Sequence, residues 1–158
     1  MSANQLASAE AQVRAWVDSV VVALNICPFA KRELDAGRVR VCAPDLAAME
    51  EALEVLADEA IKLVHEDVTA TTLVVFARGF DDFDDYLDLL DMSEALFEEC
   101  GWSESLQLAS FHPDYCFEGV EPEDASNYTN RSPLPIIHLL RQDDVAKATT
   151  SHPAVDSI

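Results

Sequence analysis

Residues 107–138 read QLASFHPDYCFEGVEPEDASNYTNRSPLPIIH, and the chain is organised around this stretch. Residues 105–111 alternate between two faces, which predicts a strand. Because proline cannot donate to a strand ladder, we expect pairing to stop after His112, at Pro113. Residues 135–140 predict a second strand. The connection between them shows no clear helical or strand period, and structureless loops of this length are usually functional or disordered.

Two features of this connection favour an ordered loop over a disordered one. Tyr115, Phe117 and Tyr128 are aromatic anchors. Residues 127–133 are dense in Asn, Thr and Ser, whose side chains bond to nearby backbone and tighten loops. Since function concentrates on loops held by a rigid scaffold, the first hypothesis is a small-molecule site in this loop. The alternative is an ordered surface loop without chemistry.

Arg131 is the strongest candidate for ligand binding. No Lys or Arg lies between Arg78 and Arg131, and Asn127, Asn130 and Ser132 lie beside it. A guanidinium with nearby amides binds a carboxylate or a phosphate, which predicts a small anionic ligand. The alternative is that Arg131 pairs with a Glu or Asp of the same loop and only holds the loop in shape.

His112 is the predicted acid or base of this site, because imidazole titrates near neutrality without help. Tyr115 and Tyr128 are expected to wall the pocket. Cys27 is a second candidate catalytic residue, on the rim of the site where the first helix ends. The protein would then be an enzyme or a binding protein that acts on a small anion.

Cys27 also has a structural interpretation. Pro28 stops the first helix, so Cys27 lies just past a helix C-terminus. The carbonyl groups there disfavour a thiolate, unless Lys31 and Arg32 compensate. A small buried side chain at a helix exit is the alternative role.

A metal site is the second hypothesis. Cys27, His112, Cys116 and His138 would supply a sulfur and nitrogen set suited to zinc or copper. The set is scattered, however, and scattered Cys and His are usually packing residues. We therefore expect no required metal, and the sequence identifies no cofactor. His138 lies on a core-facing strand position, so we expect it to be buried and hydrogen-bonded.

The composition excludes several classes of protein. The chain has 158 residues, of which 49% are hydrophobic, and this suits one domain with a real core. Its formal net charge is −20, which repels nucleic acid and acidic membranes. No apolar run approaches a membrane span, no secretion signal is evident, and the four cysteines lack C-x-x-C spacing, so we expect a cytoplasmic protein with reduced thiols. The acidic surface suits a salt-tolerant source or a non-catalytic interaction module, which is the third hypothesis. The sequence does not define an oligomeric state.

Helices and strands alternate along the chain, which predicts an α/β fold. Helices are expected at about 9–25, at 45–65 with Asp45 as N-cap, and from Asp82 to a C-terminal Gly101. The apolar run TTLVVFA at 71–77 predicts the most buried strand, and residues 38–43 predict an edge strand. We predict a single domain over 1–158 with a four-stranded mixed sheet, three to four helices and a long functional loop between the last two strands. Residues 1–8 and 149–158 are expected to be loose tails.

Four segments carry a family resemblance. They are LNICPF at 24–29, FHP at 111–113, NYTNRSP at 127–133 and HLLR at 138–141. Together they resemble a family of short bacterial proteins that is known as a domain of unknown function, and the resemblance covers nearly the whole chain. The family has no assigned activity, so the resemblance implies no function. It implies an aliphatic or small residue in place of Cys116, which argues against a site that needs this thiol.

Overall fold

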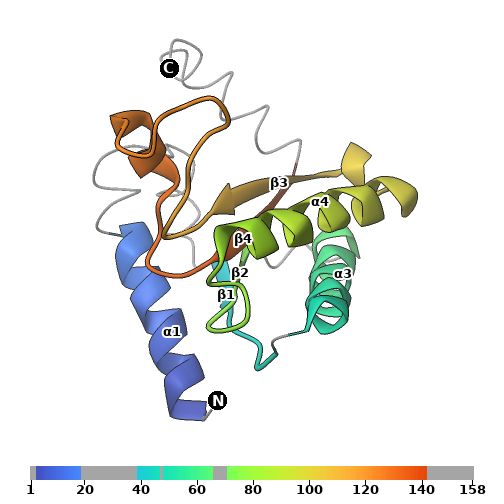
Figure 1. Cartoon of the computed structure of the whole chain (residues 1–158). Helices are drawn as coiled ribbons and strands as arrows, with labels where there is room; N and C mark the ends of the chain where they lie inside the picture. The colour runs from blue at the N-terminus through green and yellow to red at the C-terminus, as the bar shows by residue number, and fades with distance from the viewer. Residues whose placement is uncertain (1–2, 19–38, 47, 66–70, 142–158) are drawn as a thin grey trace.

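A four-stranded mixed sheet forms the centre of the protein. The structure is a computed structural model that describes residues 3–18, 39–46, 48–65 and 71–141. The strands are β1 (Val39–Cys42), β2 (Thr71–Val75), β3 (Leu106–Phe111) and β4 (Ile136–Arg141). Their order is β1-β2-β4-β3, with β1 parallel to β2 and β4 antiparallel to both of its neighbours (Figure 1). This arrangement confirms the predicted fold class.

Helices cover both faces of this sheet. The α-helices of the described residues are α1 (Ala3–Trp16), α3 (Met49–His65) and α4 (Phe83–Glu99), and the short 3-10 helices are η2 (Trp102–Glu104) and η3 (Ala125–Asn130). The helices α3 and α4 pack on one face, whereas α1 packs on the other (Figure 1). In the described part of the chain, no helix is both long and apolar enough to cross a membrane.

The strand β2 is buried along its whole length, as predicted. Its side chains alternate between the two faces, since Leu73 and Val75 contact the cluster under α1. Val74, and Phe76 just after the strand, contact the cluster under α3 and α4. Because both faces are covered, nearly every residue of this run can be apolar.

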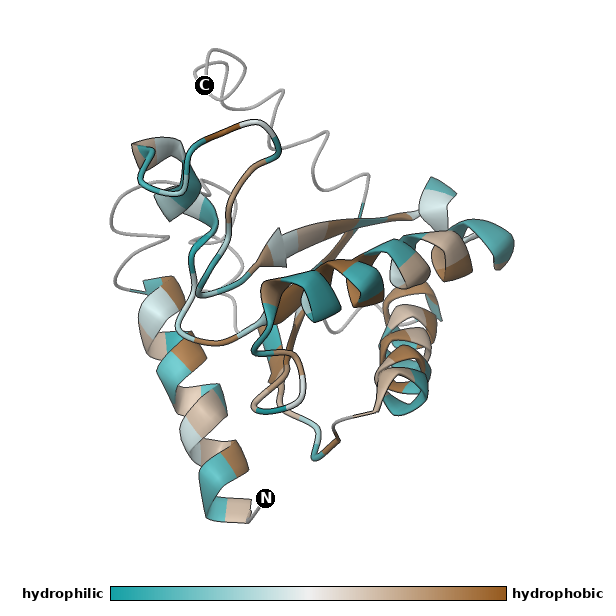
Figure 2. Cartoon of the chain, viewed as in Figure 1, coloured by the Kyte–Doolittle hydropathy of each residue, from teal (hydrophilic) through white to brown (hydrophobic). Residues whose placement is uncertain are grey.

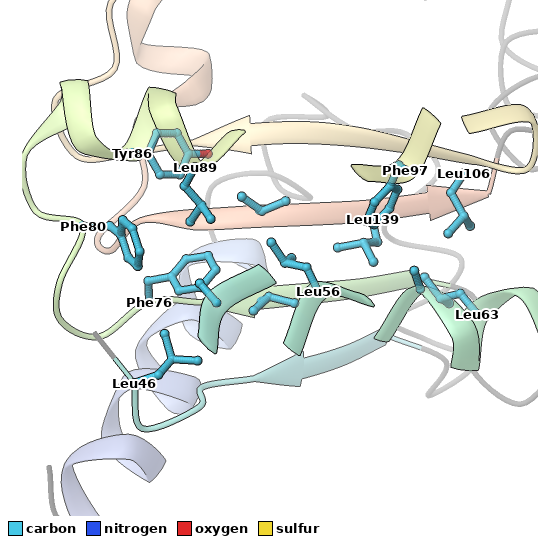
Figure 3. Close-up of a cluster of buried hydrophobic side chains, with 14 residues drawn as sticks. Leu46, Leu56, Leu63, Phe76, Phe80, Tyr86, Leu89, Phe97, Leu106 and Leu139 are labelled. Carbon is cyan, nitrogen blue, oxygen red and sulfur yellow. The ribbon is translucent and has the colours of Figure 1, made fainter. Parts of the chain in front are cut away.

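The larger core lies between the sheet and the helices α3 and α4 (Figure 3). From α4 it receives Tyr86, Leu89 and Phe97, whose spacing places them on one side of a helix. The same helix carries hydrophilic residues between these positions, so its ribbon alternates in hydropathy along its length (Figure 2). Each fully buried large apolar side chain stabilises the fold by about 1.5–3 kcal/mol.

Both ends of α4 are capped as predicted. The Asp82 carboxylate accepts hydrogen bonds from the backbone N–H groups of Asp84 (2.8 Å) and Asp85 (3.3 Å). Cys100 is the C-cap, and Gly101 follows with φ of 78°. This left-handed conformation is one that glycine adopts without steric cost.

Two predicted boundaries were wrong. The helix α1 begins at Ala3, so residues 3–8 are helical and not a loose leader. Ala9 and Val13, four residues apart, anchor it on the sheet. The helix α3 begins at Met49 and not beside Asp45, because the Asp45 carboxylate instead bonds to Arg78 (3.0 Å). The predicted helix beyond residue 18 and the predicted tail at 149–158 lie outside the described residues.

Candidate functional site

The predicted site loop connects two neighbouring strands. Because β3 and β4 are antiparallel, the last residue of β3 lies opposite the first residue of β4. Asn130 closes the loop at this point. Its carbonyl oxygen accepts a hydrogen bond from the His112 backbone N–H (3.0 Å), and its Nδ2 donates to the Ser110 carbonyl (2.8 Å). The structure thus brings His112 and Asn130 together, as their positions in the sequence predicted.

The His112 ring is enclosed and both of its nitrogens are engaged. Its exposed fraction is 0%. The backbone N–H of Asp114 donates to Nδ1 (3.0 Å), so Nε2 carries the hydrogen and donates to the Phe80 carbonyl (2.9 Å). The rings of Phe83 and Tyr86 lie 5.1 and 4.9 Å from the imidazole, measured between centroids. This geometry ties the end of β3 to the start of α4 and does not favour the predicted acid or base role.

Asn127 holds the loop from inside. Its side chain is fully buried, and its Oδ1 accepts a hydrogen bond from the Phe117 N–H (2.9 Å). Its Nδ2 donates to the carbonyl of Glu121 (2.9 Å) and lies 3.4 Å from that of Pro122. Both ends of the amide are engaged within the protein, so Asn127 shapes the loop.

Neutral groups hold the Arg131 guanidinium in place. Its Nε donates to the Tyr115 carbonyl (3.0 Å), and its Nη2 donates to the Pro122 carbonyl (2.6 Å). The Cζ atom lies 4.8 Å from the centroid of the Tyr128 ring. No carboxylate of the described residues forms an ion pair with it, so the predicted alternative of a pairing within the loop is not what holds it. The Nη1 group makes no hydrogen bond within this part of the chain.

The remaining predicted ligand contacts differ in exposure. Tyr128 is 59% exposed and forms the outer surface beside Arg131. Tyr115 is half-buried, and its hydroxyl accepts a hydrogen bond from the Ser110 Oγ (3.1 Å). Ser132 is buried and donates to the Leu134 carbonyl. Only Tyr128 therefore adds an open surface to Arg131, while Tyr115 and Ser132 support the loop.

His138 lies on the α1 side of the sheet and is buried and hydrogen-bonded, as predicted. Its exposed fraction is 8%, and its ring centroid lies 6.3 Å from that of Phe111. The Thr71 Oγ1 lies 2.6 Å from the His138 Nε2 and donates its own hydrogen to the Leu139 carbonyl (2.6 Å). The imidazole is therefore the donor to Thr71. Burial lowers the pKa of His138 to about 4, so this imidazole is neutral at pH 7.

The predicted metal ligands are not brought together. The His112 ring contacts Tyr86 of α4, whereas the His138 ring lies on the opposite face of the sheet. The Cys116 thiol donates to the Val120 carbonyl (3.1 Å). Cys27 lies outside the described residues. Within 3–18, 39–46, 48–65 and 71–141, no three His, Cys, Asp or Glu side chains are placed to share a metal ion.

A buried ion pair was missed from the sequence. The Glu59 side chain is 4% exposed, and Arg40 binds both of its oxygens, at 2.9 Å from Nη2 and 3.1 Å from Nε. The Lys62 Nζ lies 3.6 Å away. The helical spacing could have predicted its burial, since Glu59 lies three residues after Leu56 and four before Leu63, both of which are buried.

The fold and the loop define a class of protein: an α/β domain whose loop between β3 and β4 is held by its own amides and carries Arg131, which no described carboxylate pairs with. The chain belongs to the family described as Protein of unknown function (DUF1415), whose model matches residues 8–158. This match confirms the family resemblance predicted from the sequence. The comparisons with curated proteins and with solved structures found no match.

Proposed function

We propose that this protein binds a small anionic ligand through Arg131, on the outer side of the loop between β3 and β4. The observation that carries the proposal is the state of the guanidinium. Two carbonyl groups and the Tyr128 ring fix it, yet none of the described carboxylates pairs with it. A cation that is fixed in place and not neutralised is suited to a carboxylate or a phosphate.

The other predicted site residues have supporting roles in this proposal. Tyr128 supplies an exposed aromatic surface beside the anchor, on which a ligand can pack. The residues that keep the loop in shape are His112, Tyr115, Asn127, Asn130 and Ser132. Binding therefore does not depend on proton transfer by His112, and a catalytic role of Cys27 stays a prediction from the sequence.

The charge of the whole chain limits the size of the ligand. A net charge of −20 repels a polyanion, so a single cation can attract a small anion but not nucleic acid or an acidic membrane. We also propose a cytoplasmic location. The unpaired thiols of Cys42, Cys100 and Cys116 support a reducing compartment.

The test is a titration of the ¹⁵N-labelled protein with inorganic phosphate and with succinate, at constant ionic strength. We expect the side-chain Nε–H signal of Arg131 and the backbone signals near Tyr128 to shift, and we expect the backbone signals to stay unshifted in Arg131→Gln, which lacks the guanidinium. Arg78→Gln is the matched control, because Arg78 is exposed and already paired with Asp45. It should bind like the native chain.

Thermal unfolding separates binding from loop stability. If Arg131→Gln keeps its melting temperature but loses the shifts, Arg131 is the anchor. If Arg131→Lys retains the charge and binds several-fold more weakly, the forked geometry of the guanidinium contributes. The proposal is abandoned if neither anion shifts the Arg131 signal in the folded native chain.

A further inference from the structure

Among the strands that the structure describes, β3 is an outer one, and β4 is its one neighbour (Figure 1). An outer strand presents backbone groups that a further strand can bind. Which residues present them follows from the alternation of an antiparallel ladder, because successive residues point their N–H and C=O groups to opposite sides. The register of β3 with β4 is continuous from Leu106 to Phe111, so this alternation is unbroken.

Two hydrogen bonds and the strand register identify the outward groups. The Phe76 N–H donates to the Pro135 carbonyl (2.9 Å), so odd-numbered residues at this end of β4 face β2 and even-numbered ones face β3. In β3 the partners of the even-numbered β4 residues are Gln107, Ala109 and Phe111. Leu108 and Ser110 therefore face away from the sheet. The hydrogen bond from Asn130 to the Ser110 carbonyl, made from the loop, agrees with this assignment.

Asn130 closes only one end of this edge. It bonds to the Ser110 carbonyl through Nδ2 and to the His112 N–H through its own carbonyl, as a neighbouring strand would. Between Leu108 and Ser110, the outward groups that bond to no other described residue are the N–H and C=O of Leu108 and the N–H of Ser110. This open edge, defined as these three groups, is long enough for three backbone hydrogen bonds.

A groove lies beside the open edge, between α4 and β3. It has a volume of about 280 Å³, and Phe97, Leu106 and Leu108 supply its apolar surface. Glu94 and Glu98 lie along it from α4. Burial and then the charge of Asp91 raise the pKa of Glu94. A cationic side chain placed here would favour the charged form of Glu94.

We propose that the open edge of β3 binds an extended, basic segment of another protein, which joins the sheet as a fifth strand. Its backbone bonds to Leu108 and Ser110, one aliphatic side chain enters the groove, and Lys or Arg side chains meet Glu94 and Glu98. Strand addition of this kind takes affinity from the backbone and specificity from alternate side chains. A second copy of this chain is a poor occupant, because it would place two acidic surfaces together.

The test uses the full chain and a labelled peptide of five alternating lysine and valine residues. We expect the peptide to slow hydrogen exchange of the Leu108 and Ser110 amides at least tenfold while it is bound. A peptide with glutamate in place of lysine should not bind. The lysine peptide with N-methylated backbone nitrogens should also fail to bind, since it keeps the charge but cannot form a strand.

Matched variants separate the groove from the overall charge. Glu94→Gln with Glu98→Gln should weaken peptide binding by up to about tenfold, the combined effect of two exposed ion pairs. Asp88→Asn with Glu99→Gln removes the same charge from exposed positions of α4 outside the groove and should leave binding unchanged.

Three results would overturn the proposal. The N-methylated peptide binds as well as the parent peptide; both double variants weaken binding equally; or the Leu108 and Ser110 amides become protected without peptide as the chain dimerises in sedimentation. The last result would assign the edge to a second copy of the chain.

Discussion

The hydroxyl of Tyr86 donates a 2.6 Å hydrogen bond to the carbonyl oxygen of Ile136. The Tyr86 hydroxyl oxygen in turn accepts a hydrogen bond from the Phe111 N–H (3.0 Å). Phe111 and Ile136 are opposite residues at the end of the β3–β4 pair, so the hydroxyl lies between two groups of that ladder. Tyr86 thus joins α4 to both strands that flank the site loop.

Tyr86→Phe should destabilise the protein by about 1–3 kcal/mol, because a buried donor and a buried acceptor each lose a partner. Burial raises the pKa of Tyr86, so the hydroxyl stays protonated and the loss should not depend on pH below neutrality. Chemical denaturation measures the change. Tyr128→Phe is the control at an exposed tyrosine and should be neutral. Equal stability of the two variants would contradict the role of the buried hydroxyl.

Arg40→Met should destabilise the protein more than the double variant Arg40→Met with Glu59→Met. The single change leaves the enclosed Glu59 carboxylate with only Lys62 nearby, whereas the double change removes the carboxylate as well. We expect a loss of about 1–2 kcal/mol for the single variant, reduced because Arg40 is 44% exposed. Denaturant titration of the three chains measures it.

The exposed pair of Arg78 and Asp45 supplies the control for this prediction. Both side chains are more than one-third exposed, so Arg78→Met should change stability by less than about 1 kcal/mol. If Arg40→Met and Arg78→Met have the same effect, the burial of Glu59 has no energetic consequence.

The stability of the protein should fall between about pH 6.5 and pH 4 because of His138. The folded chain holds its pKa at about 4, below the ordinary value of 6.5, so the unfolded chain binds the proton first as the pH falls. The loss across this window is on the order of 3 kcal/mol. Many carboxylates also titrate there, so the measurement is the difference from His138→Gln, whose profile should be flatter. His65→Gln, at the exposed end of α3, should keep the native profile.

Asn127→Asp should open the site loop. The substitution keeps the oxygen that accepts from Phe117 but replaces the donor that faces the Glu121 carbonyl with a second oxygen. We expect a loss of about 1–3 kcal/mol and faster protease cleavage within residues 113–126. Glu123→Gln changes an exposed carboxylate of the same loop and should not alter the cleavage rate. Unchanged cleavage of Asn127→Asp would show that the amide does not hold the loop.

The strands and the caps of α4 could be predicted because their signals are local. The short, β-branched apolar run of β2 favours a strand covered on both faces. Asp82 and Gly101 mark the ends of α4 by side-chain chemistry and backbone conformation. Glu59 shows the limit of local signals, because its partner Arg40 lies in another element of the fold.

The roles of the site residues depend on contacts that the sequence does not record. A histidine at a strand end predicts an available imidazole, but the Phe80 carbonyl and the Asp114 N–H occupy both nitrogens of His112. Phe80 is thirty-two positions away along the chain. Likewise, the amides near Arg131 predicted ligand contacts, and the structure shows that they bond to backbone carbonyls of the loop and of β3. Amide-rich loops can bind either a ligand or themselves, and only geometry distinguishes the two.

The position of β4 has a consequence for how the protein is made. This strand is the last of the four along the chain, yet it lies between β2 and β3. During synthesis from the N-terminus, β2 and β3 therefore each lack their shared neighbour until the chain has reached Arg141. A chain that stops before β4 lacks a central strand of the sheet, and not merely an edge strand. Chains that include β4 can complete the sheet, whereas shorter chains cannot fold and should be degraded by proteases.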